Sequence, residues 1–268
     1  MRVVMTGAAG GVGTMTRTHL KGCFERFVVS DIRPIDDLHE GEEYARADIT
    51  DLGQMEKLLE GADGVIHLGG QPVEADWEAV LNLNIIGLYN TYEAACRQGV
   101  KRIVFATTNH VVGFYRRSQT IDHTAMPRPD SRYGASKAFG EALGRLYADK
   151  YGLRVFNIRI GNADHRPVDI RRLAIWVSPR DLAQLMRIGL EHPDIHFEVV
   201  YGASRCHRGW WDNSNAYRLD YKPQDAAEDY AKEAHEASAR NPEDPITAQF
   251  HGGPFSAMEF AGDPKRID

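Results

Sequence analysis

Short apolar runs alternate along the chain with longer stretches in which apolar residues recur at helical spacing. Strands are predicted at residues 2–5, 27–31, 47–51, 64–70, 102–106, 154–160 and 197–201. Helices are predicted at residues 14–21, 51–60, 76–98, 131–151 and 178–191. Because strands and helices alternate at this pace, the sequence predicts an α/β fold built on a doubly wound parallel sheet.

The composition narrows the kinds of partner that the protein can have. The chain has 268 residues, of which 43% are hydrophobic and 26% charged, and its formal net charge is -6 without a basic run. Binding to nucleic acid or to anionic lipid therefore has no support, and small molecules are the expected partners. Three scattered cysteines indicate reduced thiols rather than a disulfide framework, and no metal site is predicted.

The hydropathy of the chain gives no sign of a membrane segment. No apolar run approaches the ~18 residues that a membrane span requires. The first residues, Met1 to Met5, are typical of a strand and not of a signal peptide. We expect a cytoplasmic protein.

A glycine-rich turn follows the first strand and precedes a helix. Gly7, Gly10 and Gly13 are spaced G-x-x-G-x-x-G, with Gly11 and Val12 between them. Small residues allow the backbone to approach a pyrophosphate, and the helix N-terminus offers unpaired N–H donors. This context predicts a Rossmann-type dinucleotide site.

The second strand ends in Asp31, and the carboxylate of this residue favours NAD over NADP. A carboxylate here can accept both hydroxyls of an adenosine ribose and would repel a 2′-phosphate, so Asp31 predicts NAD rather than NADP. Arg33, two residues later, is the one neighbouring feature that weakens this prediction. The next apolar run, at residues 64–70, has small residues at its carboxyl end, where open parallel sheets bind their ligands. We predict that His67 is a buried strand residue and not a ligand.

Tyr133 and Lys137 lie four residues apart on the predicted helix 131–151. Residues at this spacing share one helix face, so the phenol and the ammonium point the same way. A phenol has an unperturbed pKa of about 10 and is a poor base at neutral pH unless a nearby positive charge favours the phenolate. Lys137 can supply that charge, and the pair predicts an acid/base site.

These motifs, taken in order, resemble the extended short-chain dehydrogenase/reductase family over roughly residues 1–225. The resemblance rests on the segments 6–13, Asp31, 48–49, 67–70, 84–87, 107–108, 133–137 and 219–223. It implies that Thr108 holds the reacting oxygen and that Tyr133 is the general base in oxidation. It also implies that Lys137 holds the nicotinamide ribose and lowers the pKa of the phenol, and that the protein is a homo-oligomer.

The same resemblance extends the predicted cofactor site. Asp48 and Ile49 are expected at the edge of the adenine, and Leu68 near the nicotinamide ribose. The predicted cofactor-binding residues are Gly7, Gly10, Gly11, Val12, Gly13, Asp31, Asp48, Ile49, Leu68, Gly69, Gly70, Asn84 and Lys137.

Within that family the chain most resembles uronate dehydrogenases, which oxidise the C1 hemiacetal of galacturonate or glucuronate to an aldarolactone with NAD. The narrower likeness lies in the segments 106–110, 159–161, 171–176, 201–204 and 209–214. Family members commonly carry Ser where this chain has Thr108, and a Ser where it has Pro72 or Asn162. The predicted substrate-binding residues are Thr108, Asn109, His110, Tyr133, Asn162 and Arg171.

Arg171 fits this interpretation on chemical grounds. A uronate carries a carboxylate at C6, and specific binding of a carboxylate favours a bidentate cation. Arg171 follows the sixth strand, where a substrate-covering segment is expected, although Arg166 and Arg172 lie close by in the sequence.

The sequence also predicts which parts of the chain bind the cofactor and cover the substrate, and which part is least regular. We expect one Rossmann-type domain over residues 1–268, with residues 1–160 mainly binding NAD and residues 161–268 mainly covering the substrate. From Ala226 the chain is rich in Ala and Glu, and from Asn241 in Pro and Gly. This tail is expected to pack on a neighbouring subunit or to stay mobile.

Two other functions remain open at this point. A nucleotide-sugar epimerase or dehydratase of the same fold would usually need a larger C-terminal region than residues 161–268. A non-catalytic protein that senses NAD would typically lack the Tyr and the Lys. The sequence does not identify the preferred uronic acid or the contacts of the individual sugar hydroxyls.

Overall fold

Seven parallel strands form the central sheet within residues 1–267, the part of the chain that the computed structural model describes. Their order is β3-β2-β1-β4-β5-β6-β9, so the chain winds outward from β1 in one direction and then from β4 in the other. The strands are β1 (Arg2–Thr6), β2 (Arg26–Asp31), β3 (Glu42–Arg46), β4 (Gly64–His67), β5 (Arg102–Thr108), β6 (Arg154–Ile160) and β9 (Phe197–Gly202). The predicted fold class is confirmed.

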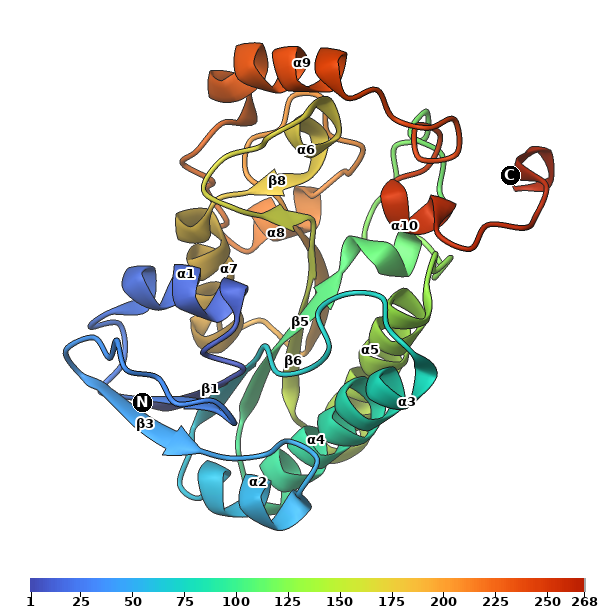
Figure 1. Cartoon of the computed structure of the whole chain (residues 1–268). Helices are drawn as coiled ribbons and strands as arrows, with labels where there is room; N and C mark the ends of the chain where they lie inside the picture. The colour runs from blue at the N-terminus through green and yellow to red at the C-terminus, as the bar shows by residue number, and fades with distance from the viewer. Residues whose placement is uncertain (268) are drawn as a thin grey trace.

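Helices cover both faces of the sheet (Figure 1). One layer contains α2 (Leu52–Leu59), α4 (Gly87–Arg97) and α5 (Arg132–Tyr151), and the other contains α1 (Gly11–Leu20) and α7 (Pro179–Glu191). Successive strand residues alternate between two apolar cores: Val3 and Phe156 belong to the core under α1 and α7, and Val4 and Val155 to the other. Because both faces are buried, these strands are continuous apolar runs.

Helix α5 carries Tyr133 and Lys137 and has well-defined ends. The Ser131 hydroxyl oxygen accepts a hydrogen bond from the Gly134 amide (2.9 Å), and Gly152 terminates the helix with φ of 75°. These ends match the predicted helix 131–151. Within residues 1–267, neither this helix of 20 residues nor any other has the length and apolar character needed to cross a membrane.

The predicted helix at 76–98 is continuous but contains a change of winding. It consists of α3 (Trp77–Val80), a π-helical segment (Leu81–Ile86) and α4. A π-helical segment is rare inside a helix and is frequent at functional sites. Here it contains the buried side chain of Asn84.

The predicted third strand is displaced by a few residues. The prediction of a strand at residues 47–51 is wrong, because β3 ends at Arg46. Beyond it, the Asp48 carboxylate accepts hydrogen bonds from the amide and the hydroxyl of Thr50 (2.9 and 2.8 Å). This turn leads the backbone out of the sheet, and Asp51 then caps α2 by accepting from the Gln54 amide (3.0 Å).

Apart from α7 and β9, the segments after β6 gather at one end of the sheet, beyond the carboxyl ends of β5 and β6 (Figure 1). Its elements are β7 (Asn162–Ala163), α6 (Ile170–Ile175), β8 (Trp176–Val177), α8 (Ser214–Arg218), α9 (Ala231–Arg240) and α10 (Pro254–Ala257). Ala234 of α9 packs against Leu173 and Trp176 of the same chain. The described part of the tail therefore packs on its own subunit, and its packing on a neighbouring subunit stays a prediction.

Candidate active site

A cavity of about 580 Å³ lies where the strand order reverses, between the carboxyl ends of β1, β2 and β4. This crevice is where doubly wound sheets bind their ligands. The predicted cofactor residues that line it are Gly7, Gly10, Gly11, Val12, Gly13, Asp31, Asp48, Ile49, Leu68, Gly69 and Gly70. The structure thus brings together residues from four separate segments of the sequence.

The glycine turn allows close backbone approach at this cavity. Gly7 has φ of +69°, and a Cβ on it would lie 2.6 Å from the Gly69 amide nitrogen. No side chain caps the N-terminus of α1, which begins directly after Gly10. Its first N–H groups are therefore available for an anionic group, and the turn and the helix together fit a dinucleotide pyrophosphate.

Asp31 lies at the end of β2, on the wall of the same cavity. Its carboxylate accepts hydrogen bonds from the amides of Ala9 (3.1 Å) and Arg33 (3.0 Å). The Arg33 side chain, 62% exposed, lies 3.6 Å from that carboxylate and donates to the Ala9 carbonyl (2.8 Å). The acid is thus fixed in place, and the neighbouring arginine is held beside it.

Asn84 lines neither of the two cavities of this site directly. Its side-chain oxygen accepts from the Gln71 amide (2.7 Å), and its Nδ2 donates to the Gln71 carbonyl (3.2 Å) and to the Ser136 hydroxyl (3.0 Å). These bonds join the loop after β4 to α5, and a contact between Asn84 and the cofactor stays a prediction.

A second cavity of about 470 Å³ adjoins the first, since both are lined by Val12, Leu68, Gly70 and Pro72. It lies at the carboxyl ends of β5 and β6 and beneath the C-terminal segments. All the predicted catalytic and substrate residues line it: Thr108, Asn109, His110, Tyr133, Lys137, Asn162 and Arg171. They come from β5, α5, β7, α6 and the turn after β5.

Tyr133, Thr108 and Lys137 are all buried in this second cavity. A hydrogen bond links the Tyr133 phenol to the Thr108 side chain. The Lys137 ammonium donates to the Ala106 carbonyl (2.9 Å) and lies 5.9 Å from the centroid of the Tyr133 ring. The i and i+4 spacing therefore does place both groups on one face, as predicted.

Burial dominates the pKa values of this pair. It raises the pKa of Tyr133 to about 12, against the lowering effect of the hydrogen bond with Thr108. Burial also lowers the pKa of Lys137 to about 8. The expected lowering of the phenol pKa by Lys137 is not found in this structure, because removal of the phenol from water is the larger effect.

Arg171 brings an unpaired positive charge to the second cavity. It is 8% exposed, and its Nε and Nη2 donate to the backbone carbonyls of His251 (3.2 and 2.8 Å) and Gly252 (3.0 Å, from Nη2). Among residues 1–267 no carboxylate forms an ion pair with it. Burial, followed by the charges of Arg117 and Arg172, lowers the pKa of Arg171 to about 10, so it is cationic at neutral pH.

Two amide side chains in the same cavity have unmet hydrogen-bonding capacity. Within the described residues, Asn109 Nδ2 and Asn162 Oδ1 are buried atoms without a partner. An unpartnered buried donor or acceptor costs about 1–3 kcal/mol, so such groups indicate a polar ligand. His110 is held between partners: its Nδ1 lies 2.8 Å from the Asp130 carboxylate, and its ring stacks on Phe255 at 4.1 Å.

Comparison with known proteins identifies the family. Residues 3–163 match the model of the NAD dependent epimerase/dehydratase family. The chain belongs to this family. The predicted resemblance to extended short-chain dehydrogenases/reductases is therefore confirmed.

Individual members of the family resemble the whole chain. A uronate dehydrogenase from Pseudomonas putida is 41% identical over 256 residues, which are 95% of each protein. An L-arabinose 1-dehydrogenase (NAD(P)(+)) from Haloferax volcanii is 40% identical over 84% of this chain and 96% of its own length. The crystal structure of a uronate dehydrogenase mutant from Agrobacterium tumefaciens, in complex with NAD, superposes with a TM-score of 0.90 at 39% identity and covers 96% of this chain and 97% of that one.

The structure adds residues to the site that the sequence did not indicate. Gly252, Pro254 and Phe255 line the second cavity, although they lie in the tail without periodicity. Glu74 accepts a hydrogen bond from the Tyr133 amide (2.8 Å) and thus holds the start of α5. The succession Gly252-Gly253-Pro254-Phe255, an aromatic residue after a sharp turn, is the one sequence signal for this wall.

Proposed function

We propose that this protein is an NAD-dependent uronate dehydrogenase. It oxidises the C1 hemiacetal of a hexuronic acid, galacturonate or glucuronate, to the aldarolactone. The similarity to uronate dehydrogenases over nearly the whole chain supports this activity. Residues 1–160 mainly bind NAD, and residues 161–268 mainly cover the sugar acid. The cytoplasmic location and the homo-oligomer stay predictions from the sequence.

One structural observation carries the choice of substrate. Arg171 is a buried guanidinium without a carboxylate partner in the described chain, and it lines the same cavity as Tyr133. A buried unpaired charge is costly, and a substrate carboxylate would compensate it through charge-assisted hydrogen bonds. A uronate has such a carboxylate at C6 and a reactive hydroxyl at C1, so one molecule can meet both residues.

The first cavity fits NAD. The amides after Gly10 and the close approach permitted at Gly7 suit its pyrophosphate, and Asp31 suits the hydroxyls of an unphosphorylated ribose. Lys137 lines the second cavity, which adjoins the first, and suits the nicotinamide ribose. When NAD is bound, it accepts the hydride that leaves C1.

The residues of the second cavity perform the proton transfer. Thr108 holds the C1 hydroxyl, and Tyr133 removes its proton while the carbonyl of the lactone forms. Asn109, His110 and Asn162 bind ring hydroxyls, with Asn109 Nδ2 as a donor and Asn162 Oδ1 as an acceptor. Because the pKa of Tyr133 is raised to about 12, the unprotonated phenol is scarce at neutral pH, and we expect kcat/KM for oxidation to increase with pH.

The two alternative functions have weaker support. An epimerase or dehydratase acting on a nucleotide sugar needs room for a nucleoside diphosphate, which usually requires a larger C-terminal region than residues 161–268. A protein that only senses NAD would not require Tyr133, Thr108 and Lys137 in one cavity.

The deciding experiment is to follow NADH formation with purified protein, NAD and either galacturonate or glucuronate. Galactose, glucose, L-arabinose and NADP serve as comparisons. We expect reduction of NAD only with the two acids. Equal rates with the neutral sugars would exclude Arg171 from substrate recognition, and no reduction with any monosaccharide would direct attention to nucleotide sugars.

The variant Tyr133→Phe tests the proposed base. Positioned proton transfer typically contributes about a hundredfold to ten-thousandfold in rate, so we expect kcat to fall within that range. The affinity for NAD should change little, and it can be measured by titration of the protein fluorescence. Near-normal turnover of the Tyr133→Phe variant would exclude the assignment.

A further inference from the structure

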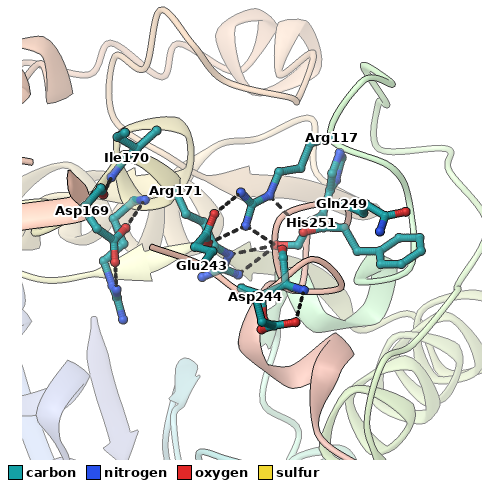
Figure 2. A network of polar contacts seen from close by, with 12 residues as sticks. Arg117, Asp169, Ile170, Arg171, Glu243, Asp244, Gln249 and His251 are labelled. Carbon is teal, nitrogen blue, oxygen red and sulfur yellow. Dashed lines mark hydrogen bonds and ion pairs between the residues drawn. The ribbon is translucent and has the colours of Figure 1, made fainter. Parts of the chain in front are cut away.

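The carboxylate-binding group of the proposed site is held by backbone and not by side chains. Arg171 donates only to the carbonyls of His251 and Gly252, while no described partner bonds its Nη1 (Figure 2). The orientation of the guanidinium therefore depends on where these carbonyls lie. A Cβ at Gly253, where φ is +63°, would come within 2.3 Å of Arg171 Nε, so the backbone passes directly against the guanidinium.

The segment that provides these carbonyls has no regular structure to fix it. It lies between the end of α9 at Arg240 and the start of α10 at Pro254. Its backbone contacts the neighbouring segment 113–117 through an isolated β-bridge between Phe250 and Arg116. It also contacts this segment through hydrogen bonds from the amides of Arg117, His251 and Gly252 to the carbonyls of Gln249, Tyr115 and Gly113 (2.9 Å each). In the described chain, the part of the segment before Gln249 has no such backbone bonds to a neighbour, so its position depends on side-chain tethers.

Arg117 is the main tether of this segment (Figure 2). Its guanidinium forms a two-bond ion pair with the Glu243 carboxylate (2.6 and 2.8 Å) and donates to the carbonyls of Thr247 (2.9 Å) and Phe250 (3.1 Å). One side chain thus joins the start of the segment to the residue that precedes His251. The Arg117 side chain is 16% exposed and the Glu243 side chain 32%, so water reaches the ion pair, whereas the bonds to the two carbonyls are partly buried.

A stack of three side chains connects the same tether to His251 from another direction. The Arg117 guanidinium lies 5.0 Å from the Trp210 ring centroid, and the Trp210 ring stacks on the His251 ring at 4.9 Å. The His251 amide also donates to the Tyr115 carbonyl (2.9 Å). His251, whose carbonyl accepts two hydrogen bonds from Arg171, is therefore held by the loop that contains Arg117.

We propose that the Arg117–Glu243 ion pair positions Arg171 and thereby sets the selectivity of the enzyme for a sugar with a carboxylate. This inference rests on the proposed function, in which Arg171 binds that carboxylate. Glu243 acts in two ways: it orients the Arg117 fork, and it compensates a charge that would otherwise repel Arg171. Arg117 and Glu243 do not touch the substrate, and both are positioning residues.

A double-mutant cycle tests this role. Glu243→Gln removes the charge but keeps the size, and Arg117→Lys keeps the charge but not the planar fork. We expect each variant to raise KM for galacturonate or glucuronate on the order of tenfold, with kcat and the KM for NAD nearly unchanged. In an Arg171→Ala background the same substitutions should cause no further loss of kcat/KM, because the group that they position is absent.

Glu43→Gln is the matched control. Glu43 forms a two-bond ion pair with Arg26 (2.9 and 2.7 Å) on β2 and β3, away from the substrate cavity. This variant should leave KM for the uronate unchanged.

The outcomes separate the inference from the proposed function. If the unmodified protein oxidises a uronate but Glu243→Gln and Arg117→Lys leave its KM unchanged, the positioning role is wrong. Equal losses with and without Arg171 would indicate general destabilisation and would also overturn it. If the unmodified protein oxidises neither uronate, the proposed function itself fails, and this inference fails with it.

Discussion

Two buried arginines near the carboxyl ends of the central strands have opposite environments. Arg159 on β6 is 3% exposed and forms two hydrogen bonds with the Glu141 carboxylate of α5 (3.0 and 2.8 Å). Arg171 on α6 is 8% exposed and has only backbone carbonyls as partners. Although burial lowers the pKa of Arg159, the bonds and charge of Glu141 raise it above its usual value, whereas the pKa of Arg171 is lowered.

This difference separates a structural cation from one that is available to a ligand. The ion pair of Arg159 is complete within the protein, and the Thr107 hydroxyl also donates to the Glu141 carboxylate (3.0 Å). Together, the Arg159–Glu141 ion pair and the Thr107 hydrogen bond join β5, β6 and α5 behind the cavity that contains Thr108 and Tyr133. Arg171 forms no ion pair in the described chain, and the more distant charges of Asp169 and Asp130 raise its pKa less than burial and the charges of Arg117 and Arg172 lower it.

Removal of the internal partner should have the largest effect on stability. Glu141→Ala leaves Arg159 buried and unpaired, so we expect the free energy of unfolding to fall by about 3–5 kcal/mol. Urea denaturation followed by circular dichroism measures this change. Glu191→Ala breaks the exposed Arg187–Glu191 pair on α7 and should cost less than about 1 kcal/mol. Similar losses in the two variants would remove the distinction between a buried and an exposed pair.

Removal of the unpaired arginine should affect activity and not stability. For Arg171→Ala we expect kcat/KM with galacturonate to fall by about a hundredfold, the usual scale for the loss of one partner from a buried charge pair. The free energy of unfolding should stay the same or increase, since an unpaired buried charge is lost. Arg171→Lys should recover part of the activity, because it restores the charge without the fork.

The comparison fails if Arg171→Ala unfolds the protein as readily as Glu141→Ala does. It also fails if the variant keeps its preference for galacturonate over galactose. Both measurements use the same purified protein.

The sequence predicts the central strands well and the edge strand poorly, for a physical reason. β1, β4, β5 and β6 are buried on both faces, so the centres of β1, β4 and β5 are apolar runs, and β6 is apolar apart from Asn157 and Arg159. β3 pairs only with β2 and is half exposed, and its sequence Glu-Glu-Tyr-Ala-Arg has no apolar run. The prediction therefore placed the strand on the next apolar residues, which belong to a turn.

The features of the candidate site likewise fall into those that the sequence predicts and those that it does not. The glycine turn and the Tyr133–Lys137 spacing are local patterns, and the structure brings them to adjoining cavities as expected. The sequence cannot show whether an arginine is paired, since Glu141 and Arg159 meet only in the folded chain. The wall formed by Gly252, Pro254 and Phe255 is held by side chains that bond to backbone carbonyls, and such bonds leave no periodicity in the sequence.

Lys137 is the third buried cation in this comparison and, like Arg171, has no carboxylate partner among the described residues. It extends the comparison to pH. Its pKa is about 8 in the folded protein and about 10.5 when exposed, so the unfolded chain binds more protons between these values. The free energy of unfolding should therefore rise with pH across this window, and the gain should be lost as pH falls through 8.

The matching variant is Lys137→Met, which keeps a long side chain but cannot titrate. Relative to this variant, we expect the unmodified protein to gain on the order of 2 kcal/mol in unfolding free energy between pH 7.5 and pH 9.5, as measured by urea denaturation. Lys101→Met removes an exposed lysine and should show no such gain. If the difference between the unmodified protein and Lys137→Met is the same at both pH values, the Lys137 ammonium is not destabilised by burial. In that case, the link between an unpaired buried charge and a bound ligand would rest on cations such as Arg171, which stay charged across this pH range.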